Sequence, residues 1–169
     1  VADYYLVMND ESIEFAVTRF NTETWMQYAR FTENHETGYY TAPKQITRKT
    51  PLHKTIIVLE MNNDSNTIMG IGIVKNYCEP ARARIYDDKN FNRYTYKHRA
   101  PRIDRSQLNM EECLLLRYFE SVCFRGSRHL KRGAGITIMP TRIIEHCLKF
   151  VNIFDSFKKM FTRESNTNI

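Results

Sequence analysis

The 169-residue sequence has no long hydrophobic run, no cysteine pair at metal-binding spacing and a single tryptophan. No apolar stretch approaches the roughly 18 residues that cross a bilayer, and the N-terminal residues lack the basic-then-apolar layout of a signal peptide. Its four cysteines, Cys78, Cys113, Cys123 and Cys147, form no CxxC or Cys/His zinc pattern. We therefore expect reduced, mostly buried thiols in an intracellular protein of the cytoplasm or nucleus that has no membrane partner.

Signatures of several enzyme classes are also missing. The sequence contains no GxxxxGK[ST], HExxH or GxSxG motif, no paired-carboxylate pattern and no phosphoryl-transfer signature. Its five histidines are scattered, and an isolated histidine is more often a surface or partly buried side chain than a general base. We expect a non-catalytic protein that needs no metal and no cofactor.

The composition is that of an ordinary globular domain. Apolar residues make up 42% of the chain and charged residues 26%, which is too apolar for a disordered protein. We expect residues 1–161 to form a single globular domain and residues 162–169 a flexible C-terminal tail. Asn, Ile, Lys, Tyr and Phe are abundant while Ala is scarce, and we interpret this as the residue usage of an AT-rich, viral genome.

Charge is unevenly distributed along a chain whose formal net charge is +6. Residues 1–41 carry a net charge of −5, residues 42–110 of +7 and residues 111–169 of +4. An acidic head followed by a basic middle and end indicates one surface that repels polyanions and one that attracts them.

Helix and strand signals alternate along the chain, as in an α+β domain. Strands are expected at residues 4–8, 13–18, 55–61, 67–75 and 136–139, with a weaker signal at 83–86. One helix should begin at Asn21 or Thr22 and end near residues 31–34, a second at Asn109, whose capping partner is Glu112, and a third at Pro140. Residues 35–54 are typical of a long loop.

The clearest strand pair joins residues 55–61 to residues 67–75 through a polar turn. Gly70 and Gly72 lie on one face of its second strand, where missing side chains allow a bulge, a bend or the close approach of another backbone. The pattern predicts sharp curvature at these glycines.

Two basic clusters are the strongest candidates for binding. The first basic cluster, residues 93–105, contains Arg93, Lys97, Arg99, Arg102 and Arg105 with His98, interleaved with Tyr94 and Tyr96. Cations release counterions from phosphates while tyrosine rings stack on bases, so this alternation suits nucleic acid. In an extended strand Tyr94, Tyr96 and His98 share one face. The alternative is that the tyrosines belong to the core and the cations to solvent.

The second basic cluster contains Arg125, Arg128, His129, Lys131 and Arg132 and runs directly into Gly133-Ala134-Gly135. Glycine-rich backbone presents amides to anions, but the order of elements is wrong for a Walker loop or a dinucleotide fingerprint. We interpret it as a loop that contacts phosphates, the alternative being a solvated turn.

Trp25 lies on the expected first helix. It is either a core anchor or one wall of an aromatic pocket for a flipped or modified base, with Tyr28, Tyr39 or Tyr40 nearby.

A strand, a helix carrying Trp25, the apolar strand 55–61, a polar turn and then Ile68-Met69-Gly70-Ile71-Gly72-Ile73-Val74-Lys75 follow one another. This order resembles the PUA-like superfamily, including its EVE and YTH branches, over residues 4 to 75. In those domains a Gly-x-Gly-x-Val strand bends to help close a small barrel. The resemblance implies a pseudo-barrel that binds RNA or modified nucleobases without catalysis. Tyr4-Tyr5 stands where the EVE branch has Tyr-Trp, and one tryptophan is fewer than a YTH cage contains.

We therefore expect an α+β domain, a curved, mostly antiparallel sheet or small PUA-like pseudo-barrel flanked by about three helices, that binds nucleic acid, RNA in preference to DNA. The expected phosphate contacts are Arg93, Lys97, Arg99, Arg102, Arg125, Arg128, Lys131 and Arg132, and the expected stacking residues are Trp25, Tyr94 and Tyr96. One alternative is a structural or interaction protein, such as a viral particle component, whose basic face binds an acidic partner. Another is a metal-dependent nuclease using Glu60, Asp64, Asp87 or Asp88.

Overall fold

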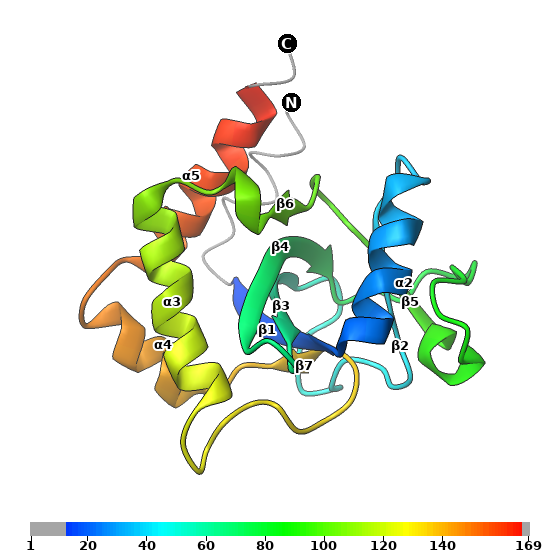
Figure 1. The fold of residues 1–169 in the computed structure, drawn as a ribbon, viewed down its shortest axis with the longest axis horizontal. Coiled ribbons are helices and arrows are strands. Elements are labelled where there is room, and N and C mark those ends of the chain that lie inside the picture. Colours follow the sequence, from blue (N-terminus) through cyan, green and yellow to red (C-terminus); the bar gives the residue numbers. More distant parts are fainter. Residues whose placement is uncertain (1–12, 167–169) are drawn as a thin grey trace.

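The computed structural model describes residues 13–166 (Figure 1). Its strands are β1 (Glu14–Phe20), β2 (Tyr39–Ala42), β3 (Thr55–Asn62), β4 (Thr67–Lys75), β5 (Tyr94–Lys97), β6 (Ile103–Asp104) and β7 (Thr137–Ile138). Its α-helices are α2 (Thr22–Glu33), α3 (Met110–Phe124), α4 (Thr141–Leu148) and α5 (Ile153–Asn166), and η1 (Lys89–Asn92) and η2 (Arg105–Gln107) are short 3-10 helices. The strand expected at residues 4–8 lies outside the described residues.

The strands form two sheets. Five of them make one sheet in the order β6-β4-β3-β1-β7, and β2 pairs with β5 in a second sheet. All pairings are antiparallel except that of β1 with β3, in which Phe15 lies opposite Ile57. The five-stranded sheet is not closed, and a single bridge between Val74 and His98 links β4 to the end of β5. The fold is thus mixed α/β, with four α-helices within residues 13–166 where about three were expected.

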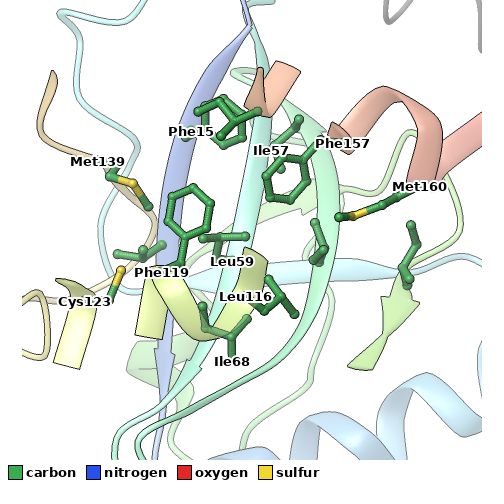
Figure 2. Packing of buried hydrophobic residues seen from close by; sticks show 14 of the residues in the cluster. Phe15, Ile57, Leu59, Ile68, Leu116, Phe119, Cys123, Met139, Phe157 and Met160 are labelled. Atoms are coloured by element: carbon green, nitrogen blue, oxygen red, sulfur yellow. The ribbon is translucent and has the colours of Figure 1, made fainter. Parts of the chain in front are cut away.

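A separate hydrophobic core lies against each face of the five-stranded sheet, because successive side chains of a strand point to opposite faces. Ile57 and Leu59 of β3 pack under α3, α4 and α5, and Figure 2 shows Phe119 and Phe157 of these helices directed at Phe15 of β1. The Phe15 and Phe157 rings are 5.2 Å apart, centroid to centroid. Ile56 and Val58, on the other face of β3, join Phe20, Tyr28, Tyr40 and Tyr96 in a second core.

The second core is covered by α2 and the β2–β5 sheet, and α2 lies on the opposite side of the strands from α3, α4 and α5 in Figure 1. Asn21 caps α2 by accepting from the Thr24 backbone N–H (2.8 Å), and Asn109 caps α3 by accepting from that of Glu112 (3.0 Å). Both caps confirm the expected helix starts, because a capping side chain satisfies a backbone donor that the first turn leaves unpaired.

The space left by the missing side chains of Gly70 and Gly72 is filled mostly by side chains from other elements, and in part by another backbone. A Cβ atom on Gly72 would lie 2.2 Å from the Tyr40 hydroxyl oxygen, and one on Gly70 would lie 2.4 Å from Arg102 Nη2. The carbonyl of Ile103 is also within 2.7 Å of that second position. Of the alternatives expected here, the close approach of another backbone occurs at Gly70, whereas Gly72 faces only side-chain atoms of Tyr40. The expected sharp curvature stays a prediction.

Several sequence expectations were wrong in detail. The segment expected as a long loop, residues 35–54, contains β2, which pairs with β5, a strand 50 or more positions later. No strand forms at residues 83–86, and the helix expected from Pro140 onward is divided into α4 and α5. Helix α5 continues to Asn166, inside the segment expected as a tail. Strand β2 is short and lacks an apolar run that would identify it in the sequence. It forms a strand through its pairing with the distant β5.

Candidate functional site

The loop that carries the second basic cluster passes beside the end of β1. Two of its carbonyl groups accept from side chains of β1 and of the turn after β3: Arg19 Nε donates to Leu130 (2.5 Å) and Asn63 Nδ2 donates to Lys131 (2.9 Å). Gly133 and Gly135 have φ angles of +117° and +74°, which residues with a Cβ atom rarely adopt. The glycines therefore let the loop fold back against the sheet directly after its cations.

A cavity of about 230 Å³ lies where this loop meets the start of α2. This first cavity is lined by the end of β1, the start of α2, part of β2 and the loop after it, the glycine turn, and three residues from other segments. The lining residues are Thr18, Arg19, Phe20, Asn21, Thr24, Thr41, Pro43, Asn63, Tyr86, Phe91, Gly133, Ala134 and Gly135. It is smaller than the roughly 300–1,000 Å³ typical of pockets for drug-sized ligands, so its size suits a single ring system.

Two polar atoms in the wall of the first cavity are buried without a partner among the described residues: Arg19 Nη1, a donor, and Asn63 Oδ1, an acceptor. The other two nitrogens of Arg19 each have a partner, since Nε donates to the Leu130 carbonyl and Nη2 donates to Thr137 Oγ1 (2.9 Å). The bond from Asn63 Nδ2 to a carbonyl fixes which amide atom is the nitrogen, and hence that Oδ1 is the unpaired one.

Leaving such atoms unpaired is costly, about 1–3 kcal/mol for each buried group. Burial also lowers the pKa of Arg19, with Cys123 acting weakly in the opposite direction, and this is the direction expected for a guanidinium that is only partly compensated. Buried unpaired groups in folded proteins are few and call for an explanation, such as a ligand that completes them. A donor and an acceptor from the lining of one cavity are the kinds of group that pair with the edge of a nucleobase.

Aromatic side chains form another wall of the first cavity. Tyr86 and Phe91 pack edge-to-face, with ring centroids 6.0 Å apart, and Phe91 is 40% exposed. An exposed phenylalanine ring beside a cavity has a free face on which a base can stack.

The four phosphate-contact residues expected in the second basic cluster lie along the loop that leads to the glycine turn of the first cavity. Arg125, Arg128 and Arg132 are exposed, while Lys131 is half-buried and lies near Asp64. Hydrogen bonds from Thr22 lower the pKa of Asp64, and the charge of Lys131 lowers it further. None of the four makes an ion pair within the described part of the chain. These cations are therefore available to an external anion.

The fold places the cations of the first basic cluster in different environments, some exposed and some paired with carboxylates. Arg93 follows η1 and lies 5.9 Å from the Tyr94 ring centroid, at the end of β5 nearest the first cavity, and both Arg93 and Lys97 are exposed. Arg99 is half-buried and paired with Glu79 at 3.6 Å. Arg102 lies inside, with all three of its guanidinium nitrogens bound to Glu60 or Asp104.

The expected stacking residues also have different environments. Trp25 packs edge-to-face on Phe20 (5.2 Å between centroids) and beneath the Arg102 guanidinium (5.2 Å). Tyr94 is half-buried, whereas Tyr96 is 1% exposed and its hydroxyl accepts from the Ile46 backbone N–H (2.9 Å). A ring buried as deeply as Tyr96 has no open face for a base, which contradicts a stacking role. The expected common face of Tyr94, Tyr96 and His98 is the inner face of β5.

A buried polar network accounts for Arg102 and for Glu60, one of the candidate nuclease carboxylates. Glu60 is 0% exposed and accepts from Tyr40 Oη (2.7 Å), Tyr28 Oη (3.2 Å) and the Nε and Nη2 of Arg102 (2.7 Å each). Burial raises the pKa of Tyr28 and of Tyr40, and Glu60 raises both further. These tyrosines stay protonated and act as donors to the carboxylate.

The other candidate carboxylates serve as local caps or lie apart. Asp64 accepts from the backbone N–H of Thr22 at the start of α2 (2.8 Å), and Asp88 caps η1. No group of three or more metal-ligating side chains occurs within residues 13–166. The cysteines are free thiols, and burial raises the pKa of Cys123 to about 12.

Sequence reasoning missed the most important residues of the first cavity: Arg19, Asn63, Tyr86 and Phe91. Phe91 could have been predicted as a contact residue, since it is an aromatic residue two positions before the first basic cluster. Arg19 and Asn63 carried no local signal, because their partners Leu130 and Lys131 are 111 and 68 positions away.

No protein-family model matches the chain, and searches of curated proteins and of solved structures likewise find no match. Among the helices of residues 13–166, none combines the length and the apolar composition that crossing a bilayer requires.

Proposed function

We propose that this protein binds single-stranded nucleic acid, RNA in preference to DNA, without catalysing a reaction on it, and that the first cavity receives one flipped or modified base. The observation that carries the proposal is the pair of buried atoms Arg19 Nη1 and Asn63 Oδ1, which belong to the lining of the first cavity and have no partner among the described residues. The loop that precedes its glycine turn in the sequence carries the cations of the second basic cluster. Sequence-specific RNA recognition depends on splayed bases of this kind, hydrogen-bonded along their edges and stacked on aromatic rings.

In the proposed complex, Arg19 donates to a carbonyl or ring nitrogen of the base and Asn63 accepts from its amino or imino group. The Phe91 ring contacts the base plane. Arg128, Lys131 and Arg132 neutralise the phosphates on either side of the base, which releases counterions and makes binding depend on salt.

The proposal includes a PUA-like arrangement of the two sheets. In it the β2–β5 sheet continues from β4 through the Val74–His98 bridge and forms an incomplete pseudo-barrel around the second core. The order of strand, helix and Gly-x-Gly strand supports this arrangement, as does the packing of Tyr40 and Tyr96 from the small sheet against β3.

The first experiment measures fluorescence anisotropy of labelled eight- to twelve-nucleotide RNA and DNA, modified and unmodified, at several salt concentrations. A triple variant, Arg128→Glu, Lys131→Glu and Arg132→Glu, should abolish binding. The matched control, Arg117→Glu, Lys149→Glu and Lys159→Glu, changes net charge equally at exposed positions on α3, after α4 and on α5, and should retain most of it.

A second variant tests the cavity separately from the charge. Ala134→Phe places a ring into the first cavity without removing a hydrogen bond, and should weaken binding at least tenfold. Ala81→Phe, at an exposed position outside the cavity lining, should have no effect. Retention of wild-type affinity by Ala134→Phe would refute base capture, and indistinguishable behaviour of the two charge variants would refute nucleic-acid binding by this loop.

A further inference from the structure

A second, larger cavity lies at the opposite end of α2 from the first. It has a volume of about 440 Å³, within the range of ligand pockets, and is formed by the end of α2, the turn into β2 and the segment between β5 and β6. Its lining includes Glu36, Gly38, His98, Arg99 and Arg102.

Three nitrogen atoms in the wall of the second cavity are buried and have no partner among the described residues: Nδ1 and Nε2 of His98 and Nε of Arg99. The His98 side chain is held in place on other sides. Its ring packs edge-to-face on Tyr40 (4.3 Å between centroids), and a Cβ atom on Gly38 would lie 2.4 Å from its Nδ1. Gly38 therefore leaves the space that the imidazole occupies, and the ring is closely packed while its two nitrogens have no hydrogen-bond partner among the described residues.

His98 is 8% exposed, and a buried imidazole without any hydrogen bond is rare in a folded protein. Burial, together with a smaller contribution from the nearby Arg102 guanidinium, lowers the pKa of His98 to about 3. The neutral ring carries one N–H donor in either tautomer. A structural histidine would be expected to donate that proton to a carbonyl or a carboxylate, and the described part of the chain provides no such acceptor.

An unused guanidinium donor in the second cavity favours an anionic ligand. Arg99 provides this donor, whereas the three guanidinium nitrogens of Arg102 are bound to Glu60 or Asp104, and Glu36 is the one carboxylate of the lining. The Arg99 ion pair with Glu79 is long, at 3.6 Å, and leaves Nε unused. Guanidinium donors that approach an oxyanion give charge-assisted hydrogen bonds, which are about twice as strong as neutral ones.

We propose that the second cavity binds a phosphate group, with Arg99 and His98 donating to its oxygens above the Arg102–Glu60 pair. The phosphate could belong to a free nucleotide or to the backbone of a bound strand, and only the second source rests on the function proposed above. Helix α2 has 12 residues and is therefore about 18 Å long, so a strand of several nucleotides reaches from one cavity to the other.

The test is an amide and imidazole NMR titration of the full chain with inorganic phosphate, with uridine monophosphate and with a ten-nucleotide RNA. Binding at the second cavity shifts the signals of Gly38, His98 and Arg99. Arg99→Gln, at a half-buried position, should weaken phosphate binding at least tenfold, and His98→Phe should weaken it comparably. Arg117→Gln, on the exposed side of α3, is the control and should leave affinity unchanged.

The outcomes separate the two sources and the two proposals. Shifts with inorganic phosphate and uridine monophosphate, retained in Ala134→Phe, support a small-molecule phosphate site that is independent of the first cavity. Shifts with RNA alone, lost in both Ala134→Phe and Arg99→Gln, support a backbone-phosphate site. If none of the three probes moves the Gly38, His98 and Arg99 signals, the second cavity is not a phosphate site, whatever the first cavity binds.

Discussion

Replacing Arg102 by methionine tests whether the buried network organises the second core. The substitution keeps an unbranched apolar side chain over the Trp25 ring but leaves the Glu60 carboxylate, which is 0% exposed, with the two tyrosine hydroxyls as its only side-chain donors among the described residues. Removing one partner of a buried ion pair costs about 3–5 kcal/mol, because the other charge remains desolvated. Arg102 is itself 16% exposed on its side chain, so the lower half of that range is the expected loss.

The loss should depend on the charge of Glu60 and not on the shape of its side chain. Glu60→Gln keeps an oxygen that can accept from Tyr28 and Tyr40 and removes the negative charge. Combined with Arg102→Met, it should therefore restore about 1–3 kcal/mol, the coupling usual for residues in one network. Arg99→Met, which breaks the longer and more exposed pair with Glu79, should cost no more than about 1 kcal/mol.

Urea denaturation followed by circular dichroism gives the free energy of unfolding for each variant. For a chain of this length, 3 kcal/mol corresponds to a fall in Tm of roughly 6–12 °C. A loss below about 1 kcal/mol for Arg102→Met, or additive effects of Arg102→Met and Glu60→Gln, would show that the network does not hold the second core together.

Two further predictions concern buried rings of the same core. His98 has a pKa of 6.5 when exposed and of about 3 when folded, so the unfolded chain binds more protons between these values and the folded state loses stability as pH falls through that window. The difference in unfolding free energy between wild type and His98→Phe should change by up to about 1.4 kcal/mol per pH unit below pH 6.5, and a flat difference between pH 4 and 6 would contradict it. Tyr96→Phe should cost about 1–3 kcal/mol in urea denaturation, because the buried N–H of Ile46 loses its acceptor, while affinity for RNA stays the same. A selective loss of RNA affinity in Tyr96→Phe with unchanged stability would restore Tyr96 as a contact residue.

The elements with local signals could be predicted from the sequence. Asn21 and Asn109 indicate the starts of their helices, because an N-cap side chain bonds a backbone N–H within three residues. The β3–β4 pair is predicted because a short turn joins two apolar strands. The parallel pairing of β1 with β3 and the strand β2 could not be predicted, since each depends on a partner far along the chain. Tertiary pairing decides such strands, and local propensity does not.

For the candidate site, the sequence shows which residues are cationic but not which of them are paired with a carboxylate. The number of unpaired cations determines how strongly binding should depend on salt. Counted from the sequence, residues 93–105 offer five cations, but Arg99, Arg102 and Arg105 are each paired with a carboxylate in the structure. Arg93 and Lys97 remain, together with Arg125, Arg128, Lys131 and Arg132, and none of these six has an ion pair among the described residues. Counterion release from a single strand contributes about 0.7 to the salt slope for each phosphate neutralised, so the slope of log affinity against log salt should not be steeper than about −4. A steeper slope would mean that ion pairs such as Arg99–Glu79 open when the strand binds, and an Arg99→Gln variant would then lower the slope.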